Sequence, residues 1–297
     1  MSMTTRLLVV HARSPLHAGT GQSTAAVDLP IARDRATGFP LLPGSSIKGA
    51  LRARGRVDLP EAYTTLFGPE TADAHDHAGS IAFSDARLLL LPVRSVAGTF
   101  AWVTSPYLLS CFAREAKLAG FPSLPKPPPL PSAGFASVAE GTLLVVDVGG
   151  QPKVVLEEFD LEVDKGGATG VAEALAPLIF EDAGWRELLT RRLCIVHDDV
   201  MAFLSQHATE VVTRVSIDPE TGTAKNGQLW TEENLPAETV LVGVVEEVPS
   251  GARRRTAAPG AYLDQLQETL LSRPVQLGGK ATVGRGRCGL RLIKGGS

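Results

Sequence analysis

Residues 5–12 read TRLLVVHA, and residues 46–55, after a long loop rich in glycine and proline, read SIKGALRARG. The first run is short and mostly apolar, so it predicts a strand. The second predicts a short helix that begins at the serine pair 45–46 and ends at Gly55. Residues 79–93, GSIAFSDARLLLLPV, predict one or two further strands. This order is too irregular for a doubly wound parallel sheet and favours an α+β fold with an antiparallel sheet.

Further elements follow along the chain. Pro106 after Ser105 predicts the start of a helix that runs to about Gly120, because proline is favoured at the first helical position. The run LPKPPPLP within 121–134 predicts a proline-rich linker or surface loop. The other predicted elements are strands at 142–148, 153–162 and 287–293, and helices near 171–192 and 260–272.

A long hairpin is predicted across 209–248. Residues 209–217 and 239–248 are strand-like, and they flank the segment IDPETGTAKNGQLWTEENLP. That segment contains an Asp-Pro pair and glycines, which are typical of the turns between paired strands.

The composition limits the possible functions. Of 297 residues, 44% are apolar and 21% charged, which is typical of a soluble globular protein. The net charge of −3 means that any nucleic-acid site needs locally gathered basic residues, and 5% aromatics argues against rows of stacked bases. The cysteines form no CxxC pair, which fits a reducing cytoplasm. The apolar runs are too short for a signal peptide or a membrane span.

The segment 277–292, LGGKATVGRGRCGLRL, joins glycines to basic residues. Its GxGxxG pattern formally matches a dinucleotide fingerprint, but no following helix and second strand are predicted. Glycines allow close approach to a phosphate backbone, and Lys280, Arg285 and Arg287 can neutralise it. A glycine-rich turn with solvated charges remains the alternative.

A second basic group lies in the predicted helix. Lys48 and Arg52 are four residues apart and therefore share one helix face. Ser45 and Ser46 stand at the helix N-terminus, where free backbone N–H groups suit a phosphate. Taken alone, this group is better explained as a solvated helix face.

Candidate catalytic groups lie in the glycine-rich loop and the hairpin. Asp28, in AAVDLPIARD, can bind a divalent ion or act as a general base, although most loop aspartates cap turns. His17 precedes it by eleven residues and can lie nearby, whereas Asp34 has basic neighbours that favour an ordinary ion pair. Glu232 and Glu233 are adjacent, so only one can face a given site. The run His75-Asp76-His77 lacks a third metal ligand at a suitable spacing.

Several segments together resemble the RAMP superfamily of CRISPR proteins, and within it the backbone subunit of type III-B (Cmr) effectors. They are LHAGTG, VDLPIARDRATGFPLLPGSSIKGALR, LFG, GSIAFSDARLLLLPVRS, FAWVTSP, GQLWTEENLP and GGKATVGRGRCGL, in this order. The resemblance covers nearly the whole chain and is weakest over 121–205.

The resemblance implies one RAMP domain over 1–297, with a ferredoxin-like (RRM-like) core, large insertions and a projecting β-hairpin thumb. Copies of such subunits stack head to tail along a guide RNA, beside other Cmr subunits. Each thumb interrupts the duplex between guide and target RNA at a regular interval. The expected location is the cytoplasm, without a membrane partner.

The resemblance also implies roles for single residues. The cleavage aspartate falls on Asp28, the loop histidine on His17 and the acidic thumb position on Glu232. Guide-binding positions fall on Lys48 and Arg52, and less securely on Arg285 and Arg287. The implied reaction is attack of a target 2′-hydroxyl on the adjacent phosphate, helped by a divalent ion, Mg²⁺ or Mn²⁺; Asp28 is expected to hold this ion or to position the hydroxyl.

Three alternatives stay open on sequence alone. One is a structural guide-RNA-binding subunit without cutting activity. Another is a CRISPR-repeat-processing endoribonuclease, which the VDLPI and FAWVTSP segments argue against. The third is a small-molecule enzyme with a glycine-rich phosphate site, which the missing strand–helix–strand context argues against.

Overall fold

The structure is a computed structural model that describes residues 4–23, 26–70, 77–122, 124–248 and 258–296. Its centre is an antiparallel sheet with the strand order β15-β1-β13-β4. The bounds are β1 Thr5–Ala12, β4 Ala86–Arg94, β13 Val240–Glu247 and β15 Arg287–Ile293.

The sheet continues on both sides of this centre, to thirteen strands in the described part of the chain. Among the strand pairs of the described residues, only β5–β10 and β6–β9 are parallel, so the predicted antiparallel sheet is confirmed as a mostly antiparallel one. The remaining strands are β2 Leu41–Leu42, β3 Ile81–Phe83, β5 Phe100–Thr104, β6 Phe135–Val138, β7 Val145–Val148, β8 Gln151–Leu156, β9 Phe159–Lys165, β10 Leu193–Val196 and β14 Val275–Gln276.

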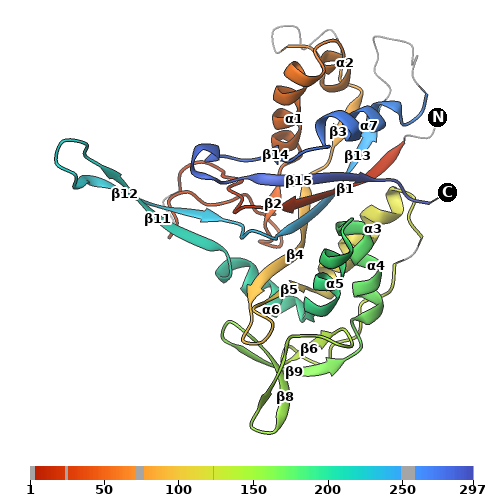
Figure 1. The fold of residues 1–297 in the computed structure, drawn as a ribbon, viewed down its shortest axis with the longest axis vertical. Coiled ribbons are helices and arrows are strands. Elements are labelled where there is room, and N and C mark those ends of the chain that lie inside the picture. Colours follow the sequence, from red (N-terminus) through yellow and green to blue (C-terminus); the bar gives the residue numbers. More distant parts are fainter. Residues whose placement is uncertain (1–3, 24–25, 71–76, 123, 249–257, 297) are drawn as a thin grey trace.

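Helices cover both faces of the central strands (Figure 1). In β1, Leu8 packs in one apolar cluster with Ile47 of α1, and Leu7 packs in a second cluster with Phe112 of α3. Burial on both faces explains the continuous apolar run at residues 7–10 of this strand. The helices are α1 Gly44–Asp58, α2 Tyr63–Phe67, α3 Pro106–Leu118, α4 Thr169–Ile179, α5 Ala183–Arg192, α6 Asp198–His207, and α7 Ala261–Gln265 with a π-helical turn Leu266–Leu270.

Two predicted helix starts have different outcomes. The start of α3 is confirmed, because Ser105 caps the helix and Pro106 occupies its first turn. The serine cap and glycine stop predicted for α1 are wrong: its N-cap is Pro43, and the helix runs past Gly55 to Asp58. Gly55 packs closely there, since a Cβ would lie 3.1 Å from the ring of Phe67.

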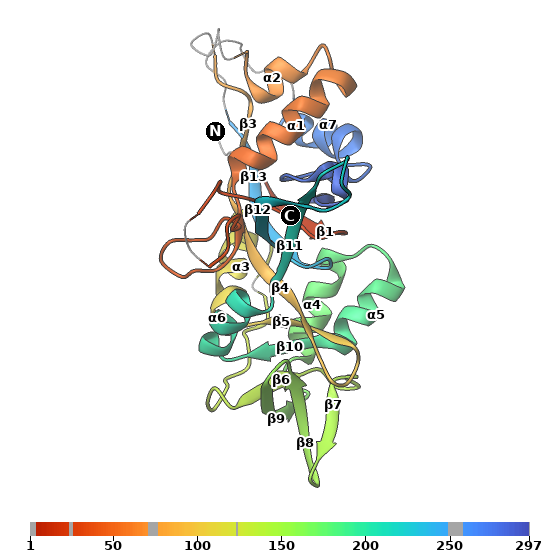
Figure 2. The same cartoon turned by 90° about the vertical axis from the view of Figure 1, so that its left-hand side faces the viewer.

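A separate two-stranded sheet, β11 (Glu210–Ile217) with β12 (Ala224–Asn234), projects from the body of the molecule (Figures 1 and 2). The hairpin predicted over 209–248 is therefore wrong in its second arm. Residues 240–247 form β13 in the central sheet, where nearly every side chain is buried. Strand propensity alone could not distinguish an exposed hairpin arm from this buried strand.

The proline-rich segment 121–134 contains no helix or strand in its described residues. Within the described ranges, no helix is both long and apolar enough to cross a membrane.

Candidate functional site

The glycine-rich loop is attached to the foot of the hairpin. Leu29 donates its N–H to the carbonyl of Thr231 at 3.0 Å, and Glu233 donates its N–H to the carbonyl of Leu29 at 3.0 Å. Leu29 thus forms an isolated parallel β-bridge with Glu232 of β12. This pairing fixes the position of Asp28, the neighbour of Leu29.

The carboxylate of Asp28 is exposed but held by one residue of β12. Its Oδ2 accepts hydrogen bonds from the backbone N–H of Thr231 at 2.8 Å and from its hydroxyl at 2.9 Å. These two bonds lower the pKa of Asp28 below its usual value of 3.8. Asp28 is therefore an ionised carboxylate at neutral pH, in a defined orientation.

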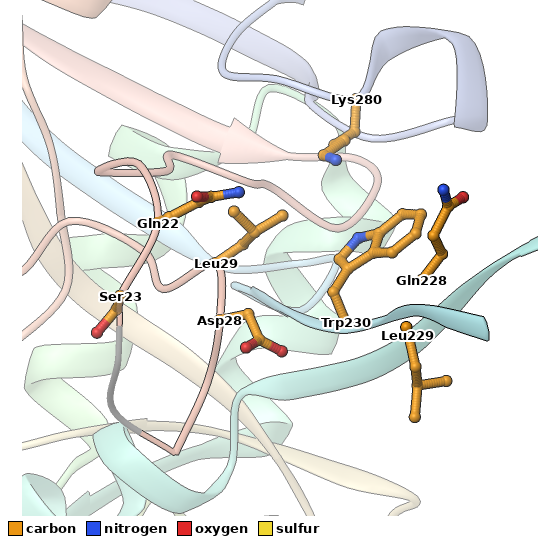
Figure 3. A pocket seen from close by; sticks show the side chains of 9 residues that line it. Gln22, Ser23, Asp28, Leu29, Gln228, Leu229, Trp230 and Lys280 are labelled. Carbon is orange, nitrogen blue, oxygen red and sulfur yellow. The ribbon is translucent and has the colours of Figure 1, made fainter. Parts of the chain in front are cut away.

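Asp28 lies at a cavity of about 480 Å³ between the loop, the hairpin and the glycine-rich segment near the C-terminus (Figure 3). Lys280, from that last segment, reaches the same cavity. The structure thus brings together two predicted site residues from opposite ends of the chain. The lining consists of Gln22, Ser23, Asp28, Leu29, Gly227, Gln228, Leu229, Trp230 and Lys280.

Glu232 is buried beside this cavity and serves as a counter-ion. Its carboxylate lies 3.0 Å from the Lys280 ammonium and 3.4 Å from Nε of Arg214, and it accepts a hydrogen bond from Nε1 of Trp230 at 2.9 Å. Burial pushes the pKa of Glu232 upward, but these hydrogen bonds and charges outweigh it and keep the pKa below its usual value. Its contacts position Lys280 and Trp230.

Glu233 faces the other side of β12, as the alternation of strand side chains predicts. It forms an ion pair with Arg33 and accepts a hydrogen bond from the N–H of Ile31 at 3.1 Å. Glu233 therefore anchors the glycine-rich loop on one face of the hairpin foot, while Glu232 holds Lys280 of the C-terminal glycine segment on the other.

His17 is buried and does not line the cavity. Its Nδ1 is 2.7 Å from the carbonyl of Glu233, and its own carbonyl accepts the N–H of Gly279 at 2.9 Å. A Cβ on Gly278, whose φ is +67°, would lie 2.2 Å from that carbonyl, so glycine is required there. These contacts join the N-terminal loop, β12 and the C-terminal glycine segment.

The basic face of α1 borders a second cavity of about 510 Å³. Ser45, Lys48 and Arg52 line it, and Arg52 also donates to the carbonyl of Pro69 at 2.5 Å and lies 3.5 Å from Glu70. Ser46 is exposed but does not line it.

The helix N-terminus is less open than predicted. The N–H of Gly44 donates to the carboxylate of Asp85 at 2.8 Å, and the N–H of Ser46 donates to the carbonyl of Pro43 at 2.9 Å. The exposed side chains of α1 are therefore more available to a phosphate than its backbone.

The two arginines of the glycine segment differ. Arg285 is largely buried and lies 3.7 Å from Glu210 at the base of β11, so it joins the segment to the hairpin. Arg287, at the start of β15, is exposed.

Comparison with known proteins identifies the family. Residues 9–289 match the model of the RAMP superfamily. The chain belongs to the RAMP superfamily. "CRISPR system Cmr endoribonuclease Cmr4" of Pyrococcus furiosus is 35% identical over 286 residues, covering 94% of this chain and 92% of the relative.

Solved structures of RAMP proteins share this fold. The crystal structure of oligomeric Cmr4 from Pyrococcus furiosus matches with a TM-score of 0.74 and 28% identity, over 99% of this chain and 100% of the other. A cryo-EM structure of the type III-B Cmr-beta complex bound to cognate target RNA matches with a TM-score of 0.70 and 20% identity, over 97% and 96% of the chains. The second likeness concerns the fold alone.

The other acidic and histidine candidates of this RAMP chain are less suited to a site. Asp34 caps its own turn by accepting the N–H groups of Ala36 and Thr37, both at 3.0 Å. His75 and Asp76 lie outside the described residues, and Nε2 of His77 is 3.4 Å from the carbonyl of Thr64. Over the described ranges, no three His, Cys, Asp or Glu residues gather as a metal-binding group.

Sequence reasoning missed Thr231 and Trp230, which are neighbours of the predicted Glu232. The available signal was the position of Trp230 two residues before Glu232, which puts both on one face of a strand. The pairing of Thr231 with Asp28 leaves no local signal, because it depends on the docking of two distant segments.

Proposed function

We propose that this chain is the repeated backbone subunit of a type III-B CRISPR effector, which binds guide RNA and cuts complementary target RNA at regular intervals. The observation that carries the proposal is the ionised, exposed carboxylate of Asp28, held by Thr231 at the foot of a projecting hairpin and at the same cavity as Lys280. The name of the Pyrococcus furiosus relative, an endoribonuclease, supports the activity.

The proposed core is ferredoxin-like. A βαββαβ unit with antiparallel strand order 4-1-3-2 would correspond to β1, α1, β4, β13, α7 and β15, and the observed order β15-β1-β13-β4 supports it. The hairpin β11–β12 enters between β4 and β13 in the chain and would be the thumb. Since helices cover both faces of the core strands, RNA would bind at loops and the hairpin.

The proposed reaction is attack of a target 2′-hydroxyl on the adjacent phosphate, which leaves a 2′,3′-cyclic phosphate and a 5′-hydroxyl. A hairpin that unstacks a nucleotide would allow the in-line geometry that a regular duplex forbids. Lys280 would contact the phosphate as a cation, and Glu232 would keep it in place. His17 would keep the loop, the hairpin and the glycine segment in register.

A divalent ion fits the residues around Asp28. Both hydrogen bonds from Thr231 go to Oδ2, and the carboxylate is exposed. Mg²⁺ is usually bound by one or two carboxylates together with phosphate oxygens and water, so a single aspartate with RNA present is sufficient. When bound at Asp28, Mg²⁺ or Mn²⁺ would supply charge stabilisation to the reacting phosphate.

The guide RNA would follow the basic face of α1 and the glycine segment. Lys48, Arg52 and the exposed Arg287 would neutralise its phosphates, with Ser45 and Ser46 as hydroxyl donors. Further copies of the chain would stack head to tail along the guide, beside other Cmr subunits, in the cytoplasm. The acidic net charge is compatible with this, because only one surface needs to be basic.

One observation favours a structural subunit without cutting activity. Two of the three predicted catalytic residues, His17 and Glu232, are engaged in contacts that organise the site. Asp28 is then the one catalytic candidate left among the three, and a structural subunit needs no more than these organising contacts.

The test is to identify the product ends of a target RNA treated with the guide-loaded complex. The proposal expects 5′-hydroxyl and 2′,3′-cyclic phosphate ends at a constant spacing. Intact target in the presence of bound complex would support the structural alternative, and cleavage of free repeat RNA by the isolated chain would support a processing enzyme.

A further inference from the structure

The backbone pairing between the glycine-rich loop and β12 is short. Leu29 donates its N–H to the carbonyl of Thr231 and accepts the N–H of Glu233, both at 3.0 Å, as an isolated bridge. The next bond of a parallel ladder would join the N–H of Ile31 to the carbonyl of Glu233. That carbonyl lies 2.7 Å from Nδ1 of His17 instead. Beyond Leu29, the pairing therefore depends on a side chain.

The carboxylate of Glu233 continues this pairing. Its Oε2 accepts the N–H of Ile31 at 3.1 Å, which is the N–H that the carbonyl does not take. Its Oε1 accepts the hydroxyl of Thr209 at 3.0 Å and forms an ion pair with Arg33. The side chain of Glu233 is only 7% exposed, and that of Arg33 is 23% exposed. Both carboxylate oxygens are thus engaged in a largely buried set of contacts.

Arg33 connects the same loop to a second element. Its Nη1 donates to the carbonyl of Gly38 at 2.9 Å, within the loop, and to the carbonyl of Ser205 at 3.1 Å, near the end of α6. Its Nη2 donates to Glu233. A guanidinium presents several donors in one fixed plane, so this side chain can hold three partners at once. The loop that carries Asp28 is therefore fastened to both β12 and α6.

We propose that Glu233 and Arg33 are positioning residues, which set the rate of target cleavage by holding the Asp28 loop in register on β12. The inference rests on the proposed function and adds to it the contacts that fix the position of its carboxylate. Neither side chain lines the Asp28 cavity, so both act through the loop and not on the RNA. A displacement of about 1 Å at a reacting group can lower a rate by roughly 100-fold.

The test is single-turnover cleavage by complexes of full-length chains with guide RNA, in excess over target. Glu233→Gln keeps the shape of the side chain and removes its charge. Arg33→Lys keeps a charge and loses the planar set of donors. The rate constant at saturation reports how fast correctly assembled complexes cut, whereas their number appears in the amplitude. The complex concentration that gives half the maximal rate reports target binding.

Two matched controls separate positioning from general stability. Glu247, the last residue of β13, is also a buried carboxylate, and it accepts the N–H groups of Gly260 and Tyr262 at 2.8 and 2.9 Å. Glu247→Gln therefore makes the same chemical change in a different part of the fold. Arg35→Gln removes an exposed arginine from the same loop as Arg33.

We expect Glu233→Gln and Arg33→Lys to lower the saturating rate constant by about 10-fold to 100-fold, with unchanged target binding. Both controls should keep the wild-type rate constant, even where Glu247→Gln lowers the amplitude. In an Asp28→Asn background, Glu233→Gln should lower the remaining rate no further. The reason is that the effects of residues acting as one unit do not add.

A wild-type rate constant with Glu233→Gln, or a loss confined to the amplitude or to target binding, would overturn the inference and leave the proposed function intact. Equal losses from Glu233→Gln with and without Asp28→Asn would also contradict it, because Glu233 would then act independently of Asp28. If Glu233→Gln complexes do not assemble, Arg33→Lys decides by the same criteria. Asp28→Asn complexes that cut at the wild-type rate would instead refute the proposed role of Asp28, and this inference with it.

Discussion

Two hydrogen bonds from Thr231 set both the orientation and the charge of Asp28. The pKa of this carboxyl is lowered chiefly by the backbone N–H and next by the hydroxyl of the same residue. A group with a depressed pKa stays ionised until the pH falls through that lowered value. The wild-type site should therefore keep its charged Asp28 throughout the neutral and mildly acidic range.

Removal of the Thr231 hydroxyl tests this dependence. Thr231→Val keeps the backbone N–H but removes the second bond, so the pKa of Asp28 rises toward its ordinary value. We expect target cleavage to fall by roughly tenfold and its acid limb to move to higher pH. Single-turnover cleavage rates measured against pH check this, with Thr231→Ser as the matched control that retains the hydroxyl. An acid limb at the same pH in the valine variant would contradict the assignment.

The helices and strands differ in how well their position and limits could be predicted from the sequence. β1 and β15 are recognisable because the limits predicted for them match the observed strands: β1 contains the apolar run 7–10, and β15 alternates buried residues with less buried ones. α3 is recognisable from Ser105 and Pro106, which act within one helical turn. β13 could not be distinguished from a hairpin arm, because its place in the sheet depends on pairing with β1 and β4. Asp28 was found from its motif, but its partner Thr231 was not, since the contact arises only when the loop docks on β12.

Shortening the hairpin β11–β12 tests its proposed role in interrupting the duplex between guide and target RNA. Val215 pairs with Leu229, so replacement of residues 216–228 by Asn-Gly would close the hairpin with a two-residue turn. The shortened strands keep Trp230, Thr231 and the attachment of the glycine-rich loop. We expect a folded chain that binds guide RNA but no longer cuts target at regular intervals, as seen on a sequencing gel. Cleavage at the usual spacing would show that another element interrupts the duplex.

At the scale of the whole molecule, a net charge of −3 must be compatible with the proposed binding to a polyanion. Basic side chains of α1 border one cavity, whereas Lys280 and Arg285 of the glycine segment are paired with Glu232 and Glu210 of the hairpin. Phosphate contacts release counter-ions, so their number appears in the salt dependence of binding. The salt dependence of guide binding therefore tests which residues contact the guide RNA, independently of cleavage.

Neutralisation of Lys48 and Arg52 tests that path. The double variant Lys48→Gln, Arg52→Gln should weaken guide binding equally for all sequences. Its slope of log affinity against log salt should fall by about 0.7 per lost contact on single-stranded RNA. Arg56→Gln is the matched control, since Arg56 lies on the same helix, is paired with Glu70 and does not line the cavity. An unchanged slope in the double variant would place the guide elsewhere.

The most direct test of the account is target cleavage by complexes that carry Asp28→Asn, which preserves shape and removes the negative charge. Asp34→Asn, in the same loop, is the matched control, because Asp34 caps a turn away from the cavity. We predict normal folding, normal guide and target binding, and a cleavage rate about 2–4 orders of magnitude lower for Asp28→Asn. The Asp34→Asn complex should cut normally, and a chelator should reproduce the Asp28 defect in the wild type. Cleavage at the wild-type rate by Asp28→Asn complexes, or their failure to assemble, would contradict a catalytic role for Asp28.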